Sequence, residues 1–465
     1  MKKILFSIAI GAALLLVGGI AKAQESLPRA PHAQVTALTP AGNSSEPSVA
    51  VNPVNPQQVV VAYQVPASIA YSADAGVHWE HAGDVAPKNL RVSGDPSVTF
   101  DNKGHAILCF IAFNKLGTFN YWGHNATTNG VFIRRSLDGG KSWEPQLITV
   151  SEQRTPPGIP LEDKPYVVAD DSHSPYAGNL YIAWTRWSLT DSRMVLSRST
   201  DDGKTWSTPI EIDNHPGLPR DDNGAVEGFD GAVGADGTLY AVWSYGDSLQ
   251  FTTSRDGGRT FSPVRDVVHT APTMFAVQDF DRANGFPQIA VDPRSGDARH
   301  AHLFLTWSDY RNGDLDVFCA RSQDGGKHWS AQVRVNNDPI HDGADQFFQW
   351  LTVDPVNGAV SVIFYDRRDD QQNRKTVVTL ARSTDGGKSF LNYAWSVKPF
   401  VASQDAFMGD YSGIASYNGR VYGAWAEMAP EIHAAAPGKT GKEAENMIKP
   451  RTLVRVGVAD FSTTK

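Results

Sequence analysis

Short apolar segments alternate with polar turns along most of the chain, and the same order of segments returns many times. An extended segment such as Pro47–Val51 is followed by a polar turn and by a strand that ends on an aromatic residue, as in Leu180–Trp184 and Leu303–Trp307. A third strand then runs into a fixed octapeptide, and a fourth strand leaves it. Four short strands repeated at a regular period are typical of the blades of a β-propeller.

The octapeptide has the pattern Ser-x-Asp-x-Gly-x-x-(Trp or Phe). Its six copies follow one another at intervals of 55 to 68 residues and begin at Ser72, Ser136, Ser199, Ser254, Ser322 and Ser383. The Asp side chain can accept hydrogen bonds from N–H groups of its own turn, Gly tolerates a positive φ, and the aromatic ring can be buried beneath the hairpin. Six copies at this spacing indicate one structural unit repeated through the chain.

The two ends of the chain complete the count of blades. After the sixth octapeptide, the segments Gly413–Tyr417, Val421–Trp425 and Thr452–Val458 read as three strands without a copy of their own, and residues 33–38 read as one spare strand. Pairing this N-terminal strand with the last three closes the ring and leaves no exposed sheet edge. The fold is therefore predicted to be an all-β propeller of seven four-stranded blades. Six blades with irregular ends are the alternative.

The first residues predict export. A positively charged start, an apolar run of 17 residues over Ile4–Ile20 and an Ala-Lys-Ala sequence at residues 21–23 are typical of a secretory signal peptide. The alternative, a membrane anchor, needs a longer uninterrupted apolar run. We expect residues 1–23 to be removed, and residues 24–465 to form one propeller domain in the periplasm or outside the cell. A segment rich in Ala, Lys and Glu, residues 429–450, is predicted to be a surface loop.

Composition narrows the classes of partner. The formal net charge is −8 and no basic stripe is visible, which argues against nucleic acid as a partner. No later segment of the sequence is long and apolar enough to cross a membrane. Cys109 and Cys319 are the only cysteines, and each lies inside an apolar strand-like run. We expect two buried free thiols and no disulfide framework.

The octapeptides resemble the Asp-boxes (BNR repeats) of the sialidase superfamily, and the resemblance covers nearly the whole mature chain. More closely, the chain is similar to secreted bacterial Asp-box proteins of the exo-alpha-sialidase type. Besides the boxes, the resemblance is carried by Ser93–Pro96, Asp163–Pro165, Trp307–Arg311 and Gly409–Tyr411. The superfamily's early Arg-Ile-Pro motif is absent. The resemblance implies a propeller acting on glycans.

The resemblance also implies a mechanism. Enzymes of this superfamily use a Tyr nucleophile activated by a carboxylate, together with an Asp that acts as acid and base, and they depart from the usual scheme of two carboxylates. Tyr411 beside Asp410 is the candidate nucleophile pair, and Asp95 is the first choice for the acid/base residue.

Acidic residues recur just before the first strand of several repeats, a place that reaches the mouth of the central channel in a propeller. Two aromatic residues, Phe286 and Phe348, take this place in repeats five and six. Carboxylates can bond sugar hydroxyls while rings stack on the C–H faces of a sugar. The alternative is that these acids cap turns by bonding local backbone. The acids are Glu46, Asp95, Asp163, Asp230 and Asp410.

Three arginines are candidates for binding a sugar carboxylate. Arg186 follows the aromatic end of the second strand by two residues, and Arg311 and Arg368 follow it by four. Classical sialidases hold the carboxylate with three arginines, because the planar guanidinium group matches it with two hydrogen bonds. The alternative is that Asp309 and Asp366 pair with the arginines to hold neighbouring loops.

No cofactor is required by this interpretation. Calcium is a weaker alternative, because Asp309, Asp314 and Asp316 lie within eight residues and offer oxygen ligands. The preferred function is release of a terminal acidic sugar by an exported glycoside hydrolase. The alternatives are a non-catalytic propeller that binds a glycan or a protein partner, and a polysaccharide-degrading enzyme with other chemistry, because one architecture hosts many functions.

Overall fold

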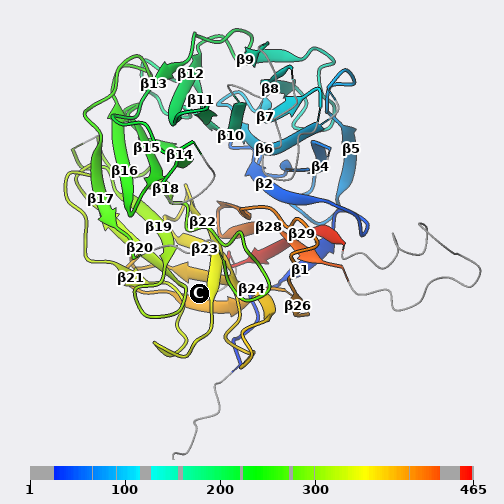
Figure 1. Cartoon of the computed structure of the whole chain (residues 1–465), viewed down its shortest axis with the longest axis vertical. Helices are drawn as coiled ribbons and strands as arrows, with labels where there is room; N and C mark the ends of the chain where they lie inside the picture. The colour runs from blue at the N-terminus through cyan, green and yellow to red at the C-terminus, as the bar shows by residue number, and fades with distance from the viewer. Residues whose placement is uncertain are drawn as a thin grey trace, which may run out of the picture.

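The computed structural model describes residues 26–462 except for 65, 91, 116–126, 155–160, 220–223, 272–275, 298, 397 and 430–450. It consists of seven antiparallel sheets arranged in a ring around one axis (Figure 1). The predicted leader and almost all of the predicted 429–450 loop lie outside the described residues. The described part of the chain contains no helix that is long and apolar enough to cross a membrane.

Six blades are consecutive in sequence, and each follows the order predicted from the repeats. Blades one and two consist of β2 (Ser45–Val51), β3 (Val59–Gln64), β4 (Ser68–Ser72), β5 (Glu80–Asp84), β6 (Val92–Phe100), β7 (Ala106–Phe113), β8 (Asn129–Ser136) and β9 (Ile148–Gln153). Blades three and four consist of β10 (Leu161–Ala169), β11 (Leu180–Trp187), β12 (Ser192–Ser199), β13 (Ile210–Glu211), β14 (Val226–Val233), β15 (Leu239–Tyr245), β16 (Ser248–Ser254) and β17 (Arg265–His269). Blades five and six consist of β18 (Gln288–Val291), β19 (Leu303–Asp309), β20 (Asp316–Ser322), β21 (Val333–Arg334), β22 (Gln346–Val353), β23 (Val360–Asp366), β24 (Lys375–Ser383) and β25 (Leu391–Ala394), with β26 (Phe400–Val401) added beside β24.

The seventh blade joins the two ends of the chain. It contains β27 (Gly413–Tyr417), β28 (Arg420–Met428) and β29 (Thr452–Asp460), and its outer strand is β1 (Gln34–Ala37). The pairing of β1 with β29 is antiparallel and extends from Gln34 opposite Val458 to Ala37 opposite Arg455. The prediction of seven blades closed by an N-terminal strand is confirmed, and the alternative of six blades is wrong.

Each octapeptide forms the turn between the third and fourth strands of its blade. In the copy of blade three, Ser199 Oγ donates to Asp201 Oδ1 at 2.8 Å, and the Gly203 and Thr205 N–H groups donate to Ser199 Oγ and Asp201 Oδ1 at 3.0 and 2.9 Å. Trp206 Nε1 closes the turn on the Gly203 carbonyl at 3.1 Å. These turns lie at the opposite end of the blades from the starts of the first strands. The turns stabilise the blades at one end of the propeller. The face at the starts of the first strands is therefore the one at which a site can lie.

The core is a series of apolar layers between neighbouring blades. The predicted aromatic ends of second strands are buried there, as shown by Trp184, Trp243 and Trp307, which are 0%, 1% and 1% exposed. Cys109 packs between blades two and three, and Cys319 packs between blades five and six. Both cysteines are buried and free, as predicted. The first strands of adjacent blades contact one another around the whole ring, so their first residues meet at the axis.

Candidate functional site

The innermost strands of five blades share one irregularity near their start. Their pairing with the second strand skips two residues, which makes a β-bulge in each. A residue in each bulge has a left-handed φ, of 48° at Glu46, 49° at Asp95, 46° at Lys164, 75° at Gly228 and 54° at Phe348. A residue other than glycine held in such a conformation costs about 1–3 kcal/mol, and such residues gather at functional sites. The repeated bulge places three charged side chains at the same level of the ring.

Glu46 and Asp95 lie close enough at this level for each to shift the pKa of the other. Both residues are buried, with 1% and 4% exposed. Gln64 at the end of β3 joins them, because its amide nitrogen donates to Glu46 Oε2 and its amide oxygen accepts from the Asp95 N–H at 3.1 Å. Glu46 Oε1 accepts from the Asp410 N–H at 3.1 Å. Blades one, two and seven therefore meet in one acidic cluster.

Two cations hold the carboxylate of Asp410. Arg282 donates from Nε to Oδ1 at 2.7 Å and from Nη2 to Oδ2 at 2.8 Å, and Lys164 Nζ contacts Oδ2. Lys164 Nζ also lies 3.5 Å from Glu227 Oε1 of blade four. Arg282 comes from the connection between blades four and five, and its guanidinium group lies 5.6 Å from the ring centre of Phe407. The cluster thus draws on charged groups from five blades and one connection.

Aromatic side chains line the channel beside these charges. The rings of Tyr411 and Trp350 are 5.8 Å apart, those of Trp350 and Tyr166 are 5.4 Å apart, and Lys164 Nζ lies 5.1 Å from the ring centre of Phe286. These five residues contribute to the lining of a cavity of about 30 Å³. A cavity of that size holds one or two water molecules. A sugar ring is too large for this cavity.

Burial and charge shift the pKa values of this cluster in opposite directions. Burial, followed by the charge of Asp410, raises the pKa of Glu46 to about 7. Burial, followed by the charge of Glu46, raises the pKa of Asp95 to about 8. Burial alone would raise the pKa of Asp410, but the charges of Arg282 and Lys164 override it and hold that pKa well below its usual range. The cluster combines protonated and permanently ionised carboxyl groups at neutral pH.

The structure brings together the three predicted catalytic residues. Burial, and then the charges of Glu46, Asp95, Asp410 and Asp163 in that order, raise the pKa of the Tyr411 phenol well above its ordinary value. The Tyr411 side chain is half-buried, whereas Asp95 and Asp410 are 4% and 3% exposed. Their roles in a reaction remain predictions.

Asp163 lies beside the cluster, one residue before the bulge of blade three. Its Oδ2 accepts from Trp187 Nε1 at 3.0 Å, and its Oδ1 accepts from the Lys164 N–H at 3.1 Å. Lys164, rather than Asp163, therefore occupies the position that Glu46 and Asp95 occupy in their blades. The prediction placed Asp163 one residue out of register.

Asp230 has a structural role and lies directly after its bulge, two residues beyond Gly228. Its Oδ2 accepts from the Ile289 N–H of blade five at 2.8 Å, and Oδ1 accepts from the Gly231 N–H at 2.9 Å. Ser48 and Ser97 make the same kind of link from one inner strand to the next. The expectation that Asp230 faces the channel mouth is corrected, because its carboxylate joins two blades through backbone N–H groups.

The two predicted aromatic platforms differ from each other. Phe286 lies beneath the Lys164 ammonium group and lines the channel cavity. Phe348 is 2% exposed and packs against Phe280, Phe347 and Tyr365. Phe348 is therefore part of the core, and the prediction of a sugar platform at this position is corrected.

The three predicted arginines do not form one cluster. Arg186 pairs with Glu162 at 2.8 Å, and Arg311 and Arg368 pair with Asp309 and Asp366. Each of these pairs lies within a single blade. Glu162 is opposite Arg186 across two strands, and Asp309 and Asp366 end the second strand two residues before their arginines. The predicted clamp of three arginines is corrected. The predicted Asp-Arg pairs form within their blades, and Arg368 also lies 3.7 Å from Asp338 of the connection between blades five and six. Lys164 and Arg282 are the cations at the axis.

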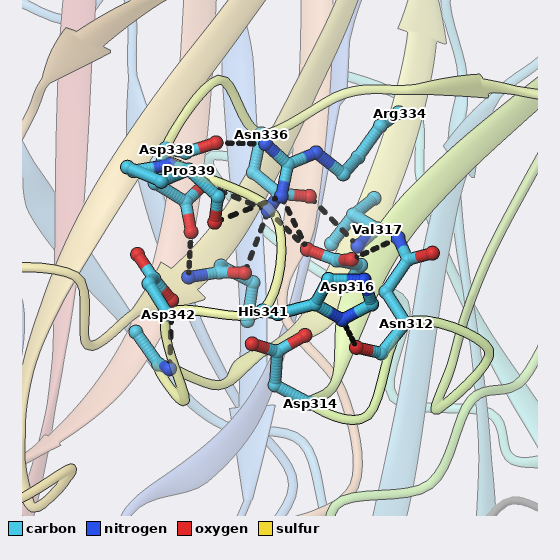
Figure 2. Close-up of polar contacts among 12 residues, drawn as sticks. Asn312, Asp314, Asp316, Val317, Arg334, Asn336, Asp338, Pro339, His341 and Asp342 are labelled. Atoms are coloured by element: carbon cyan, nitrogen blue, oxygen red, sulfur yellow. Dashed lines mark hydrogen bonds and ion pairs between the residues drawn. The ribbon is translucent and has the colours of Figure 1, made fainter.

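The acids considered for calcium take different partners. Asp309 binds Arg311 and Trp307, and Asp314 Oδ2 accepts from the Gly343 N–H at 2.8 Å. Figure 2 shows Asp316 at the meeting point of contacts from Asn312, Arg334 and Asn336. Across the described ranges, no three His, Cys, Asp or Glu side chains are grouped so that they could hold a metal ion. Calcium binding stays a prediction without a defined set of ligands.

Sequence reasoning missed Lys164, Arg282, Glu227 and Gln64. A signal for Lys164 is present in the sequence, because the residue before the proline of the innermost strand is Glu46, Asp95 and Lys164 in blades one to three. Arg282 lies in an irregular connection, whose path no repeat pattern specifies. Its place over the channel is visible only in the structure.

Comparisons with known proteins support the resemblance to sialidases. No protein family model matches the chain. A curated sialidase of Bacteroides fragilis (strain YCH46) is 26% identical over 283 residues, which are 55% of this chain and 45% of that protein. The chain therefore matches less than half of the length of this relative. The predicted resemblance to the sialidase superfamily is confirmed by this match.

Two solved sialidase structures are among those to which the chain is similar in shape. The Hadza microbial sialidase Hz136 is 15% identical with a TM-score of 0.48, and the match covers 87% of this chain and 74% of that one. The K499G mutant of NanB sialidase from Streptococcus pneumoniae is 12% identical with a TM-score of 0.49, and covers 72% of this chain and 67% of that one. These values describe likeness of shape and say nothing about the reaction.

Proposed function

We propose that this protein is an exported glycoside hydrolase that releases a terminal acidic sugar, and that the reaction takes place at the axial cluster. The observation that supports this proposal is the half-buried Tyr411 phenol, which lies among the carboxyl groups of Glu46, Asp95 and Asp410 and beside two cations. A phenol in that position can attack an anomeric carbon while a neighbouring carboxyl group protonates the leaving oxygen.

The proposed roles follow from the electrostatics. Asp95 is the acid, because its raised pKa leaves a proton on it at neutral pH. Tyr411 is the nucleophile, and the carboxylates around it receive its proton. Asp410 is a poor base, since its pKa is held low by Arg282 and Lys164. Its role is to hold these two cations at the channel mouth.

Arg282 and Lys164 are the proposed partners of the sugar carboxylate. The two-point contact of Arg282 with Asp410 has the geometry with which an arginine binds any carboxylate. A substrate carboxylate would displace Asp410 from part of this contact. The side chain of Arg282 is 27% exposed, so a substrate carboxylate can reach it from solvent.

The test is hydrolysis of a fluorogenic sialoside by the mature protein. Tyr411→Phe and Asp95→Asn are each expected to lose at least about 100-fold in kcat/KM, because a positioned acid or base is worth 10²–10⁴-fold. Arg282→Lys is expected to raise KM, since the planar two-point contact is lost. Two matched controls, Tyr393→Phe in the outer strand of blade six and Arg311→Lys, are expected to keep wild-type activity.

A non-catalytic propeller that binds glycans is the second candidate. The observation in its favour is that Asp95 and Asp410 are at most 4% exposed and that the predicted arginines are already paired with carboxylates. Absence of turnover by folded protein on sialosides and uronosides would put this candidate first. Binding to a glycan array that Arg282→Lys weakens would then place the binding site at the same channel mouth.

A further inference from the structure

A cavity of about 510 Å³ lies at the end of the propeller that carries the box turns, between blade seven and blade one. Its wall includes Gln57 from the first turn of blade one, Val77 from box one, and Tyr417, Arg420 and Tyr422 of blade seven. Pockets for small ligands have volumes of roughly 300–1,000 Å³. We propose that this cavity binds a neutral sugar residue of a glycan. The site lies at the opposite end of the blades from the axial cluster, and the proposal does not rest on the reaction proposed there.

The cavity lies where the series of boxes is interrupted. In blades one to six the box serine pairs with the residue four positions before the aromatic end of the second strand, as Ser199 pairs with Leu180. In blade seven that residue is Val421, and it pairs with Ala459. Phe461, two positions further along, takes the place of the box aspartate. Residues 459–462 therefore lack the serine and the aspartate that hold a box turn together.

Phe461 packs against blade six instead of box one. Its ring centre lies 5.4 Å from that of Tyr393 and 4.4 Å from the guanidinium group of Arg382. Ser462, the next residue, lines the cavity. The space beside box one is therefore not filled by a second box turn.

The first turn of blade seven adds to this space because it is short. Asn418 and Gly419 form the turn between the paired residues Tyr417 and Arg420, and their φ values are 49° and 87°. Asn-Gly is the preferred sequence of two-residue hairpin turns with two left-handed residues. The corresponding turn of blade one spans residues 52–58. The short turn leaves the side of the cavity that faces blade seven open to solvent.

Box one differs from the other boxes at a position that lines the cavity. The sixth residue of the octapeptide is Val77 in box one, whereas it is a lysine or an arginine in the other five boxes: Lys141, Lys204, Arg259, Lys327 and Lys388. Val77 is 51% exposed, so an apolar side chain meets solvent where the repeat otherwise has a cation. Covering such a side chain with a ligand removes apolar surface from water, which favours binding.

The wall of the cavity offers hydrogen-bond donors, acceptors and an aromatic ring without a net charge. Its charged residues are Asp74 and Arg420, whose side chains are 43% and 38% exposed and carry opposite charges. Gln57 and Asn418 add exposed amide groups, and the half-buried Tyr417 adds a ring. The hydroxyl groups of a sugar can bond to the amides and the charged groups, while its C–H face packs on the tyrosine. Because the two charges balance, a neutral sugar fits this wall better than an acidic one.

Binding of simple sugars tests the proposal without any reaction. Methyl β-D-galactoside, methyl β-D-glucoside and methyl α-D-mannoside are each titrated into the mature protein, and Kd is measured by isothermal titration calorimetry. We expect at least one of them to bind with a millimolar Kd, since a ligand with so few atoms gains little free energy on binding. Val77→Trp should weaken this binding at least about tenfold, because the larger side chain occupies part of the cavity. Tyr417→Ala should weaken it about three- to tenfold, because the aromatic contact is lost.

Lys327→Trp is the matched control, because Lys327 is exposed and holds the same position in box five. This variant and Tyr411→Phe at the axis should bind the sugar as tightly as the wild type, and urea unfolding confirms that each variant is folded. Three results would overturn the proposal: no binding of any of the three sugars, equal affinity in Val77→Trp and Lys327→Trp, or loss of binding in Tyr411→Phe, which would place the sugar at the axis. Sugar binding as expected without hydrolysis of any sialoside would instead overturn the proposed function alone.

Discussion

Lys164→Met offers a direct measure of how the axial cluster is stabilised. Methionine has similar length, but it leaves the carboxylates of Asp410 and Glu227 with one cation fewer. The side chains concerned are 9% exposed for Lys164, 2% for Asp410 and 1% for Glu227. Removing one partner of a buried ion pair costs about 3–5 kcal/mol. Here the two buried carboxylates lose the cation that they share, while Arg282 stays bound to Asp410. We expect a loss of this size at pH 7.5.

The assay is urea unfolding followed by tryptophan fluorescence, since the chain has 12 tryptophans. An entropy of about 2.1 cal/mol/K per residue over about 430 residues gives about 0.9 kcal/mol/K, so the same loss lowers Tm by roughly 3–6 °C. At pH 5 the neighbouring carboxyl groups take up a proton in the variant, and the loss should shrink. The double variant Lys164→Met/Asp410→Asn should recover at least half of it.

Lys103→Met is the control, because its side chain is 53% exposed in a surface pair with Asp202. Such pairs contribute about 0–1 kcal/mol. Two results would refute the reasoning. One is a loss below about 1 kcal/mol in Lys164→Met, and the other is an equal loss at pH 5 and pH 8. Either would mean that water reaches the cluster in solution and screens its charges.

Three further predictions concern the scaffold. The stability of the wild type should fall as pH rises from about 4 to 8. The pKa of Asp95 is raised from 3.8 to about 8 in the folded state, so the folded protein keeps a proton that the unfolded chain loses over this interval. A urea midpoint that rises between these pH values would contradict this prediction. Asp201→Ala should lower the free energy of unfolding in urea by about 1–2 kcal/mol, because the N–H and hydroxyl donors of one box turn lose their acceptor. A change within 0.5 kcal/mol, which is usual for surface substitutions, would show that the other hydrogen bonds hold the turn. Gly423→Ala should cost about 1–3 kcal/mol, since a Cβ there would lie 2.6 Å from the ring of Trp395; Gly42→Ala, where the nearest atom is 3.9 Å away, should be neutral by the same measurement.

The architecture could be predicted because it is periodic. Each box fixes a turn with bonds among its own residues, so the pattern that starts at Ser199 specifies the same turn wherever it occurs. The aromatic ends of second strands, such as Trp307, mark the buried layer between blades. Local bonds and a constant period are properties that a sequence displays directly.

The site could be predicted only in part, because it depends on register and on irregular segments. The bulge of blade four lacks the proline that follows the bulge residue in blades one to three, so Asp230 was aligned with Asp95 although it lies two positions further along its strand. Arg311 and Arg368 follow the same turn in their blades, but each turn holds its own ion pair, and the two guanidinium groups do not meet in the structure. Arg282 reaches the axis from a connection that obeys no repeat.

The strand that closes the ring also sets a condition on how the chain folds. Gln34 in β1 pairs with Val458 in β29, 424 positions further along the chain. During synthesis six blades can be complete while the seventh still lacks its partner strands, because β27, β28 and β29 are the last to emerge. Contacts of such long range slow folding and leave unpaired strand edges exposed in the meantime. The first strand therefore stays unpaired until the end of the chain is available. In this interval the protein is most prone to aggregation and most accessible to a chaperone.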